Sequence, residues 1–364
     1  MQTRQHIYRP SALVLLLFVG LLALAALQPV TSSARCFAKP REPTPAVEPF
    51  DKPEVSDDVP VPDETVEDGQ PSEGSKADVQ SPTSDISTGS DASTPPLSAE
   101  DHATFGDIVS GDDKCVIGNP STYVTREDVD WVWKHTMEKY VPQFTNLAFD
   151  QLVTNNGSLS YCVRWDNDKK LTKAVASKFQ AMLEKQLNLW HRWLVGYNCW
   201  PIDKIDVTIV GYAVRDKAIM DWSDDSLGTI YEGVLDAEGS PMCPDECYKH
   251  KGQAASADTS ACKAEPFDMS FWPSTKPGEN AIGTGGDWGQ RVEVNDMLAN
   301  MENDHMIVLL HEIGHSFGLP EMYEGKNKPS TFPVCVMDAH DEVTDGDGWL
   351  LRSILENIKS RYDF

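Results

Sequence analysis

The chain is short of basic residues. Its 364 residues include 31 Lys and Arg against 57 Asp and Glu, which gives a formal net charge of −26. A protein that binds nucleic acid neutralises phosphate groups with a basic face, and no segment of this sequence offers one. We therefore expect no nucleic-acid partner.

Aromatic residues are scarce between residues 36 and 110, where Pro, Ser, Thr, Asp and Glu dominate. Such a composition does not bury enough apolar surface to offset the entropy that folding removes. We predict a disordered acidic linker over residues 35–111, with an inhibitory pro-segment as the alternative. Residues 112–364 hold all ten tryptophans, and their number predicts one globular domain.

The chain also lacks an apolar run of the roughly 20 residues that cross a bilayer. Its longest run, residues 12–27, follows Arg4 and Arg9 and ends before Pro29. Small residues at 32–34 supply a cleavage point, so residues 1–34 are predicted to be a signal peptide of a secreted protein. Without cleavage, the same run would make a type II membrane anchor, and a membrane is expected as a partner only in that case.

Secretion would place the cysteines in an oxidising compartment, where disulfides form. The chain has eight: Cys36, Cys115, Cys162, Cys199, Cys243, Cys247, Cys262 and Cys335. An even number in a secreted protein indicates disulfides, and we extend this interpretation to the cluster over 243–262 in place of a metal site. Either Cys36 pairs with the domain or one thiol stays free. Asn156 begins a glycosylation sequon, which predicts a surface loop.

Periodicity predicts the main elements of the domain. Apolar residues at helical spacing predict one helix from Thr125 to 140 and another over 169–194. The alternating, β-branched residues 205–214 predict a strand, whereas the Gly-, Pro- and Cys-rich residues 236–290 predict loops. Residues 289–295 are a candidate short strand. Helices mixed with a few strands indicate an α+β domain with a mixed sheet.

Residues 304–317 predict a buried helix, because they are apolar on nearly every side and Asn303 or Asp304 can cap them. Within this helix His311 and His315 are four positions apart, so both imidazoles lie on one face and can bind one metal ion. Isolated histidines elsewhere are interpreted as structural or surface residues. A core helix with hydrogen-bonded histidines is the alternative for residues 304–317.

The neighbouring residues favour a catalytic metal site. Glu312 lies about 100° around the helix from His311, where a carboxylate can take a proton from a metal-bound water and pass it on. Gly318 suits a sharp turn at the helix end, and that turn brings Glu321 back as a third ligand. Three protein ligands plus one water are typical of catalytic zinc. We therefore predict Zn²⁺ at His311, His315 and Glu321, with Glu312 as the catalytic base.

These residues resemble a known family. HEIGHSFGLPE (311–321) resembles the metzincin zinc-peptidase pattern HExxHxxGxx(H/D), and FPVCVMDAH (332–340) resembles its Met-turn, with Met337 as an apolar floor beneath the metal. The chain is most similar to secreted metzincin-like proteins of fungi and related filamentous microbes, some of which carry cellulose-binding modules. The similar segments lie at 207–214, 242–250, 267–274, 285–292 and 343–352, and the resemblance spans about residues 115–360.

The resemblance implies a metzincin-like zincin domain, with a small mixed sheet on helices, an active-site helix and a Met-turn. It also implies that a polypeptide substrate binds as an extended strand at a sheet edge, for which residues 289–295 are the candidate. Trp272 and Trp288 are expected either to line a cleft or to pack in the core.

Two departures from the family pattern matter. The third ligand is Glu321, whereas the family uses His or, in its snapalysin-like branch, Asp. His340 is the substitute if Glu321 does not reach the metal. The linker shows no cysteine-switch motif.

The expected function is that of a secreted zinc endopeptidase. The alternative is a wall-associated carbohydrate-binding or adhesive protein with a structural or vestigial zinc site and cell-wall polysaccharide as its partner. A zinc hydrolase that does not act on peptides is a third reading. Glu312 favours the endopeptidase over a binding protein, because a metal that only stabilises the fold needs no base beside it.

Overall fold

The computed structural model describes residues 34–37, 108–111, 114–120, 123–276, 281–338 and 340–364. The expected signal peptide, apart from Ala34, lies outside these residues, and so does most of the expected linker. All described residues belong to one structural unit.

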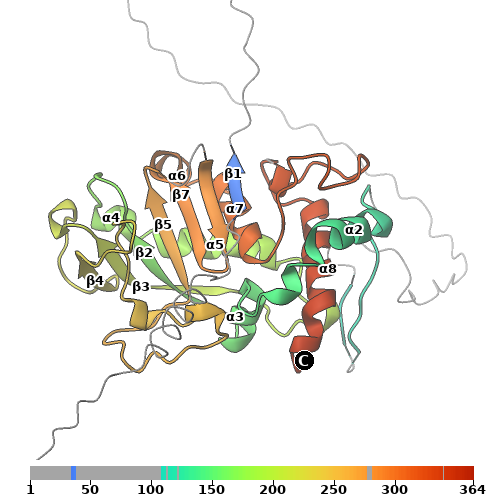
Figure 1. Cartoon of the computed structure of the whole chain (residues 1–364), viewed down its shortest axis with the longest axis horizontal. Helices are drawn as coiled ribbons and strands as arrows, with labels where there is room; N and C mark the ends of the chain where they lie inside the picture. The colour runs from blue at the N-terminus through green and yellow to red at the C-terminus, as the bar shows by residue number, and fades with distance from the viewer. Residues whose placement is uncertain (1–33, 38–107, 112–113, 121–122, 277–280, 339) are drawn as a thin grey trace, which may run out of the picture. The chain divides into compact units, whose positions relative to one another are not determined.

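A seven-stranded sheet runs through this unit (Figure 1). Its strands are β1 (Ala34–Phe37), β2 (Ser158–Arg164), β3 (Asp206–Val214), β4 (Thr229–Glu232), β5 (Met269–Ser274), β6 (Ala281–Gly286) and β7 (Gly289–Glu293). Their spatial order is β1-β6-β7-β5-β2-β3-β4. The pairs from β7 to β4 are parallel, whereas β6 is antiparallel to both β7 and β1. The α+β class with a mixed sheet is thus confirmed.

Seven α-helices accompany the sheet in the described part of the chain. They are α2 (Arg126–Val132), α3 (Ala148–Thr154), α4 (Lys173–Ala176), α5 (Phe179–His191), α6 (Val294–Asn300), α7 (Ile307–Ser316) and α8 (Asp345–Ile358). Helix α5 packs on β3 and on α7, and α7 packs on β6 and β7. Phe271 of β5 meets Phe179 of α5 edge-on, with ring centroids 5.6 Å apart. The strand periodicity then turns Trp272 towards the opposite face of the sheet.

The first predicted helix is confirmed at its start. Thr125 is the N-cap of α2, and its hydroxyl accepts a hydrogen bond from the backbone N–H of Asp128. After Val132 the chain continues as a π-helical turn to Met137.

The predicted helix over 169–194 is wrong in its extent. Leu171 pairs with the segment after β3, since its N–H donates to the carbonyl of Ile219 and its carbonyl accepts from Asp221. Thr172 then caps the short α4, and α5 follows after a break. Amphipathic spacing shows which residues are buried, but it does not reveal that a backbone group is already bonded elsewhere.

The prediction of loops over 236–290 is wrong in its second half, where β5 and β6 form. Pro273 in β5 and three glycines in β6 are residues that usually mark turns. The prediction of an edge at 289–295 is also wrong, because β7 lies between β5 and β6. The outer strands at this end of the sheet are β6 and then β1.

Three disulfides cross-link the domain: Cys115–Cys199, Cys162–Cys243 and Cys247–Cys262. The cluster over 243–262 therefore forms disulfides, as predicted. Cys335 is a free, buried thiol. Asn156 is exposed in the turn between α3 and β2, as the sequon predicts.

The folded part reaches N-terminal of the expected boundary at residue 112. Ile108 is buried, and the hydroxyl of Ser110 accepts hydrogen bonds from the backbone N–H groups of Val116 and Cys199, both at 3.0 Å. Within the described residues, no helix is both long and apolar enough to cross a bilayer.

Candidate metal centre

Helix α7 carries the two histidines through the interior. Nine of its ten residues are buried, and Ile307 at its start is the exception. The N-cap is Met306, so the prediction of Asn303 or Asp304 is wrong. The side chain of Gln186 from α5 replaces a local cap, since its oxygen accepts from Met306 N–H and its amide donates to the Asp304 carbonyl. This exchange fixes the start of α7 to α5.

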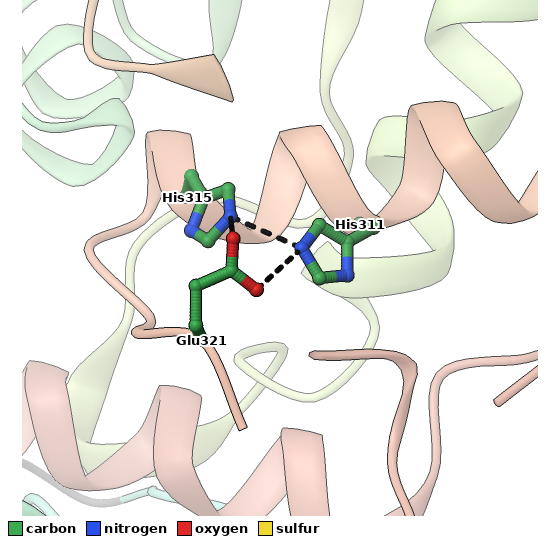
Figure 2. Close-up of side chains that lie close together, drawn as sticks. All are labelled: His311, His315 and Glu321. Carbon is green, nitrogen blue, oxygen red and sulfur yellow. Dashed lines mark hydrogen bonds and ion pairs between the residues drawn. The ribbon is translucent and has the colours of Figure 1, made fainter. Parts of the chain in front are cut away.

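The structure brings His311, His315 and Glu321 together (Figure 2). The two Nε2 atoms lie 3.1 Å apart. The carboxylate of Glu321 reaches both, with one oxygen 3.2 Å from His311 Nε2 and the other 3.4 Å from His315 Nε2. The predicted triad therefore has one ligand atom from each residue facing a common point.

Backbone carbonyls fix the protonation of both rings. His311 Nδ1 lies 2.9 Å from the Val336 carbonyl, and His315 Nδ1 lies 2.9 Å from the Leu319 carbonyl. A carbonyl oxygen only accepts, so each Nδ1 carries the proton, and a neutral imidazole then has its lone pair on Nε2. Burial lowers the pKa of His315, which keeps that ring neutral.

Two lone pairs and a carboxylate thus face one another. The side chain of Glu321 is 23% exposed, and a glutamate in contact with water has a pKa near 4.3, so Glu321 is an anion at neutral pH. This set of groups suits a cation. A tetrahedral zinc site with bonds near 2.1 Å has ligand–ligand edges of about 3.4 Å, close to the three separations in the triad.

Access to the triad is from the Glu321 side. The side chains of His311 and His315 are each 2% exposed, whereas that of Glu321 is 23% exposed. Gly318 makes the turn that returns the chain, with φ of 96°, a left-handed conformation that favours glycine. The predicted role of Gly318 is confirmed.

Glu312 is fully buried beside the triad. Neither of its carboxylate oxygens has a hydrogen-bond partner among the described residues, and burial raises its pKa to about 8. Strand β6 closes over it: a Cβ placed on Gly283 would lie 2.2 Å from Glu312 Oε1. An unpaired buried carboxyl is costly to fold around, so its presence beside three potential ligands needs a functional reason.

The predicted Met-turn lies beneath α7. A Cβ on Gly314 would lie 2.4 Å from the sulfur of Met337, so helix and turn meet where only glycine fits. Asp347 holds the turn from α8, because its carboxylate accepts from the backbone N–H groups of Val336 at 2.9 Å and Met337 at 3.3 Å. The same turn contains Val336, whose carbonyl orients the His311 ring.

Sequence reasoning missed three parts of this arrangement. Tyr323 stacks on the His311 ring, with centroids 5.4 Å apart and planes 15° from parallel. Asp347 and the Leu319 carbonyl were also missed. For Tyr323 the sequence did contain a signal. It lies two residues after Glu321, so a chain that places Glu321 near α7 must also place Tyr323 near α7.

The alternative ligand His340 lies outside the triad. His340 is part of the described chain but not of the triad, and its Nδ1 lies 3.1 Å from a carboxylate oxygen of Asp341. The structural interpretation of His191 and His250 holds: both are buried, and they pair with Trp200 and Asp268.

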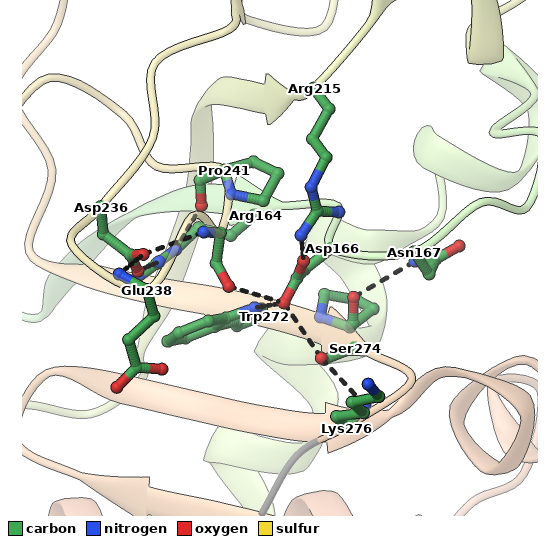
Figure 3. A network of polar contacts seen from close by, with 12 residues as sticks. Arg164, Asp166, Asn167, Arg215, Asp236, Glu238, Pro241, Trp272, Ser274 and Lys276 are labelled. Carbon is green, nitrogen blue, oxygen red and sulfur yellow. Dashed lines mark hydrogen bonds and ion pairs between the residues drawn. The ribbon is translucent and has the colours of Figure 1, made fainter.

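The tryptophans lie on the sheet face away from α7. Trp272 is 8% exposed, and the guanidinium groups of Arg164 and Arg291 lie 3.5 and 3.9 Å from its ring centroid. Its Nε1 donates to Asp166 at 2.9 Å, at the centre of a polar network (Figure 3). Trp272 and Trp288 also line a cavity of about 230 Å³. Since this cavity opens on the far face, it is not part of the metal centre.

Neither a protein-family model, nor a curated protein, nor a solved structure matches this chain.

Proposed function

We propose that the protein is a secreted zinc endopeptidase of the metzincin type. The observation that carries the proposal is that the Nε2 atoms of His311 and His315 and the carboxylate of Glu321 face one point. Beside them lies the buried carboxyl of Glu312, which has no hydrogen-bond partner among the described residues. The resemblance of residues 311–321 and 332–340 to the metzincin patterns supports the same conclusion. The three disulfides fit an oxidising, extracellular compartment.

His311, His315 and Glu321 would hold the zinc ion, which when bound lowers the pKa of water towards 7 and polarises a carbonyl. The chain itself supplies the remaining functions. The carbonyls of Val336 and Leu319 keep the two Nε2 atoms aimed at the ion.

Glu312 is the proton carrier of the proposed reaction. Burial raises the pKa of Glu312 when no ion is bound, and a cation in the triad would lower it again. As a carboxylate it would then take a proton from the attacking water at one of its oxygens, and it would return that proton to the amine that leaves. Its oxygens are unoccupied by other donors, so both are available for this transfer. Because Glu312 is fully buried, bulk water does not reach the carboxyl and exchange with the proton that it holds.

No observation favours a binding protein with a structural metal. In such a protein Glu312 would have no role, and replacing an unpaired buried carboxyl by an uncharged side chain would stabilise the fold. Buried polar groups in native structures are nearly always hydrogen-bonded, and a catalytic role is one of the usual reasons for an exception.

The test measures zinc content and digestion of a mixed peptide library for the purified chain and for Glu312→Gln. We expect one zinc per chain in both proteins, and a loss of hydrolysis by about 10²–10⁴-fold in Glu312→Gln, the usual contribution of a general base. Glu324→Gln, at an exposed position paired with Lys326, is the matched control and should be as active as the wild type. A wild-type chain that binds zinc but cleaves no peptide would refute the proposed function.

A further inference from the structure

Strand β1 is separated in sequence from the other described segments. It pairs antiparallel with β6, with Ala34 opposite Gly285, Arg35 opposite Thr284 and Cys36 opposite Gly283. Seventy residues, 38–107, separate it from the next described segment. Its pairing with a strand so far along the chain is the feature that needs a reason.

That position is beside the candidate metal centre. Gly283 and Gly285 of β6 pack directly on Glu312, since a Cβ on either would lie 2.2 Å from an atom of that residue. Paired strands are about 4.8 Å apart, so the backbone of β1 runs one strand beyond the proposed base. Strand β1 also contacts α7 itself (Figure 1).

Without β1, strand β6 would be the edge of the sheet. An edge strand presents unpaired N–H and C=O groups, and an extended peptide binds such an edge by adding a strand. For an endopeptidase this is the edge along which a substrate would pass the catalytic base. Strand β1 uses the same backbone groups.

We propose that residues 35–37 are a built-in competitor, which occupies the substrate edge of β6 and must leave before a polypeptide binds there. This inference rests on the proposed function, because it assigns the β6 edge to the substrate. Both Arg35 and Cys36 follow the expected cleavage point after Ala34, so they remain in the mature chain. The composition of residues 38–107 predicts a disordered linker, and for such a linker effective concentrations are about 1 mM or lower. A short strand at that concentration is displaceable by substrate.

The experiment replaces Arg35 and Cys36 by proline in the full chain. Residues along an antiparallel pair alternate between hydrogen-bonded and non-bonded positions. One of the two prolines must therefore remove a ladder donor, whichever set is bonded. The control places the same pair of prolines at Val79 and Gln80, within the Pro-rich segment.

Two readouts do not need catalysis. Hydrogen exchange should become faster at residues 281–286 in the Arg35→Pro/Cys36→Pro chain and stay unchanged within α7. A labelled peptide that copies residues 33–40, with Ser in place of Cys, should bind this variant about tenfold more tightly than the parent chain. Both are measured in the Glu312→Gln background, so that the peptide survives.

The third readout is hydrolysis of a fluorogenic peptide, which should rise severalfold in the proline variant at low substrate and not in the control. If peptide binding rises but no chain cleaves peptide, the proposed function fails and the competitor stands. Equal peptide binding and equal β6 exchange in parent and variant would overturn the competitor, whatever the activity.

Discussion

Single residues near the metal centre show what local sequence rules capture. The spacing of His311 and His315 on a helix, and the turn at Gly318, are local properties, so the triad follows from the sequence. The groups that orient the triad are distant in sequence: the Val336 carbonyl reaches His311, and Asp347 in turn holds Val336, only through tertiary packing. No local sequence pattern predicts these contacts.

Glu321 is the proposed ligand that departs from the metzincin pattern. Glu321→Ala leaves two imidazoles, and we expect zinc affinity to fall by more than about 100-fold, since even outer residues of a metal site contribute 10–100-fold. Glu321→Asp should lose less, because it keeps the carboxylate but shortens its reach. Zinc content after dialysis against a weak chelator measures both.

His340→Ala is the control for Glu321 and should keep full zinc content. Full zinc in Glu321→Ala together with zinc loss in His340→Ala would reverse the ligand assignment.

Asp268 predicts a pH dependence. Burial alone would raise its pKa, but hydrogen bonds from His250 and Ser160 and the charge of Lys249 lower it to about 2. Because the folded pKa lies below the unfolded value of about 3.9, Asp268 stabilises the fold fully above that value. This stabilisation, about 2 kcal/mol, is lost as the pH falls towards 2.

The Asp268→Asn chain lacks this titration. Urea unfolding at pH 6 and pH 2.5 should therefore show a smaller loss of stability on acidification than in the parent. Equal losses in both proteins would show that Asp268 does not contribute to acid sensitivity.

Among the elements, those with clean periodicity were predictable and those shaped by a neighbour were not. Strand β3 alternates and was predicted within one residue of its bounds. Strand β6 was read as a loop because Gly283, Gly285 and Gly286 are turn residues by composition. In the structure the first two are there because Glu312 leaves no space for a Cβ.

Gly285→Ala tests this close approach of β6 and α7. Its Cβ would lie 2.2 Å from the backbone oxygen of Glu312, which cannot rotate away. We expect a loss of about 1–3 kcal/mol or more from overpacking, seen as a melting temperature several degrees lower. Gly325→Ala, where a Cβ meets nothing within 4 Å, should leave the melting temperature unchanged. Equal melting temperatures in the two variants would contradict the packing argument.

For the molecule as a whole, composition located the domain but not its first residues. Ile108 is 5% exposed and Val109 is 67% exposed, so we expect Ile108→Ala to cost about 2–4 kcal/mol and Val109→Ala to be nearly neutral. Chemical unfolding of both variants measures this.

A chain starting at residue 112 should be less stable than one starting at 107, and equal stabilities would place the boundary after Ser110.

The disulfides divide the molecule unequally. All three join residues between Cys115 and Cys262, whereas α7, the Met-turn and α8 follow Cys262 and hold the free thiol Cys335. A disulfide stabilises a fold mainly by restricting the unfolded chain. The part that carries the proposed chemistry gains none of this stabilisation from the three disulfides. An ion that binds only the folded arrangement would add stability to that part instead.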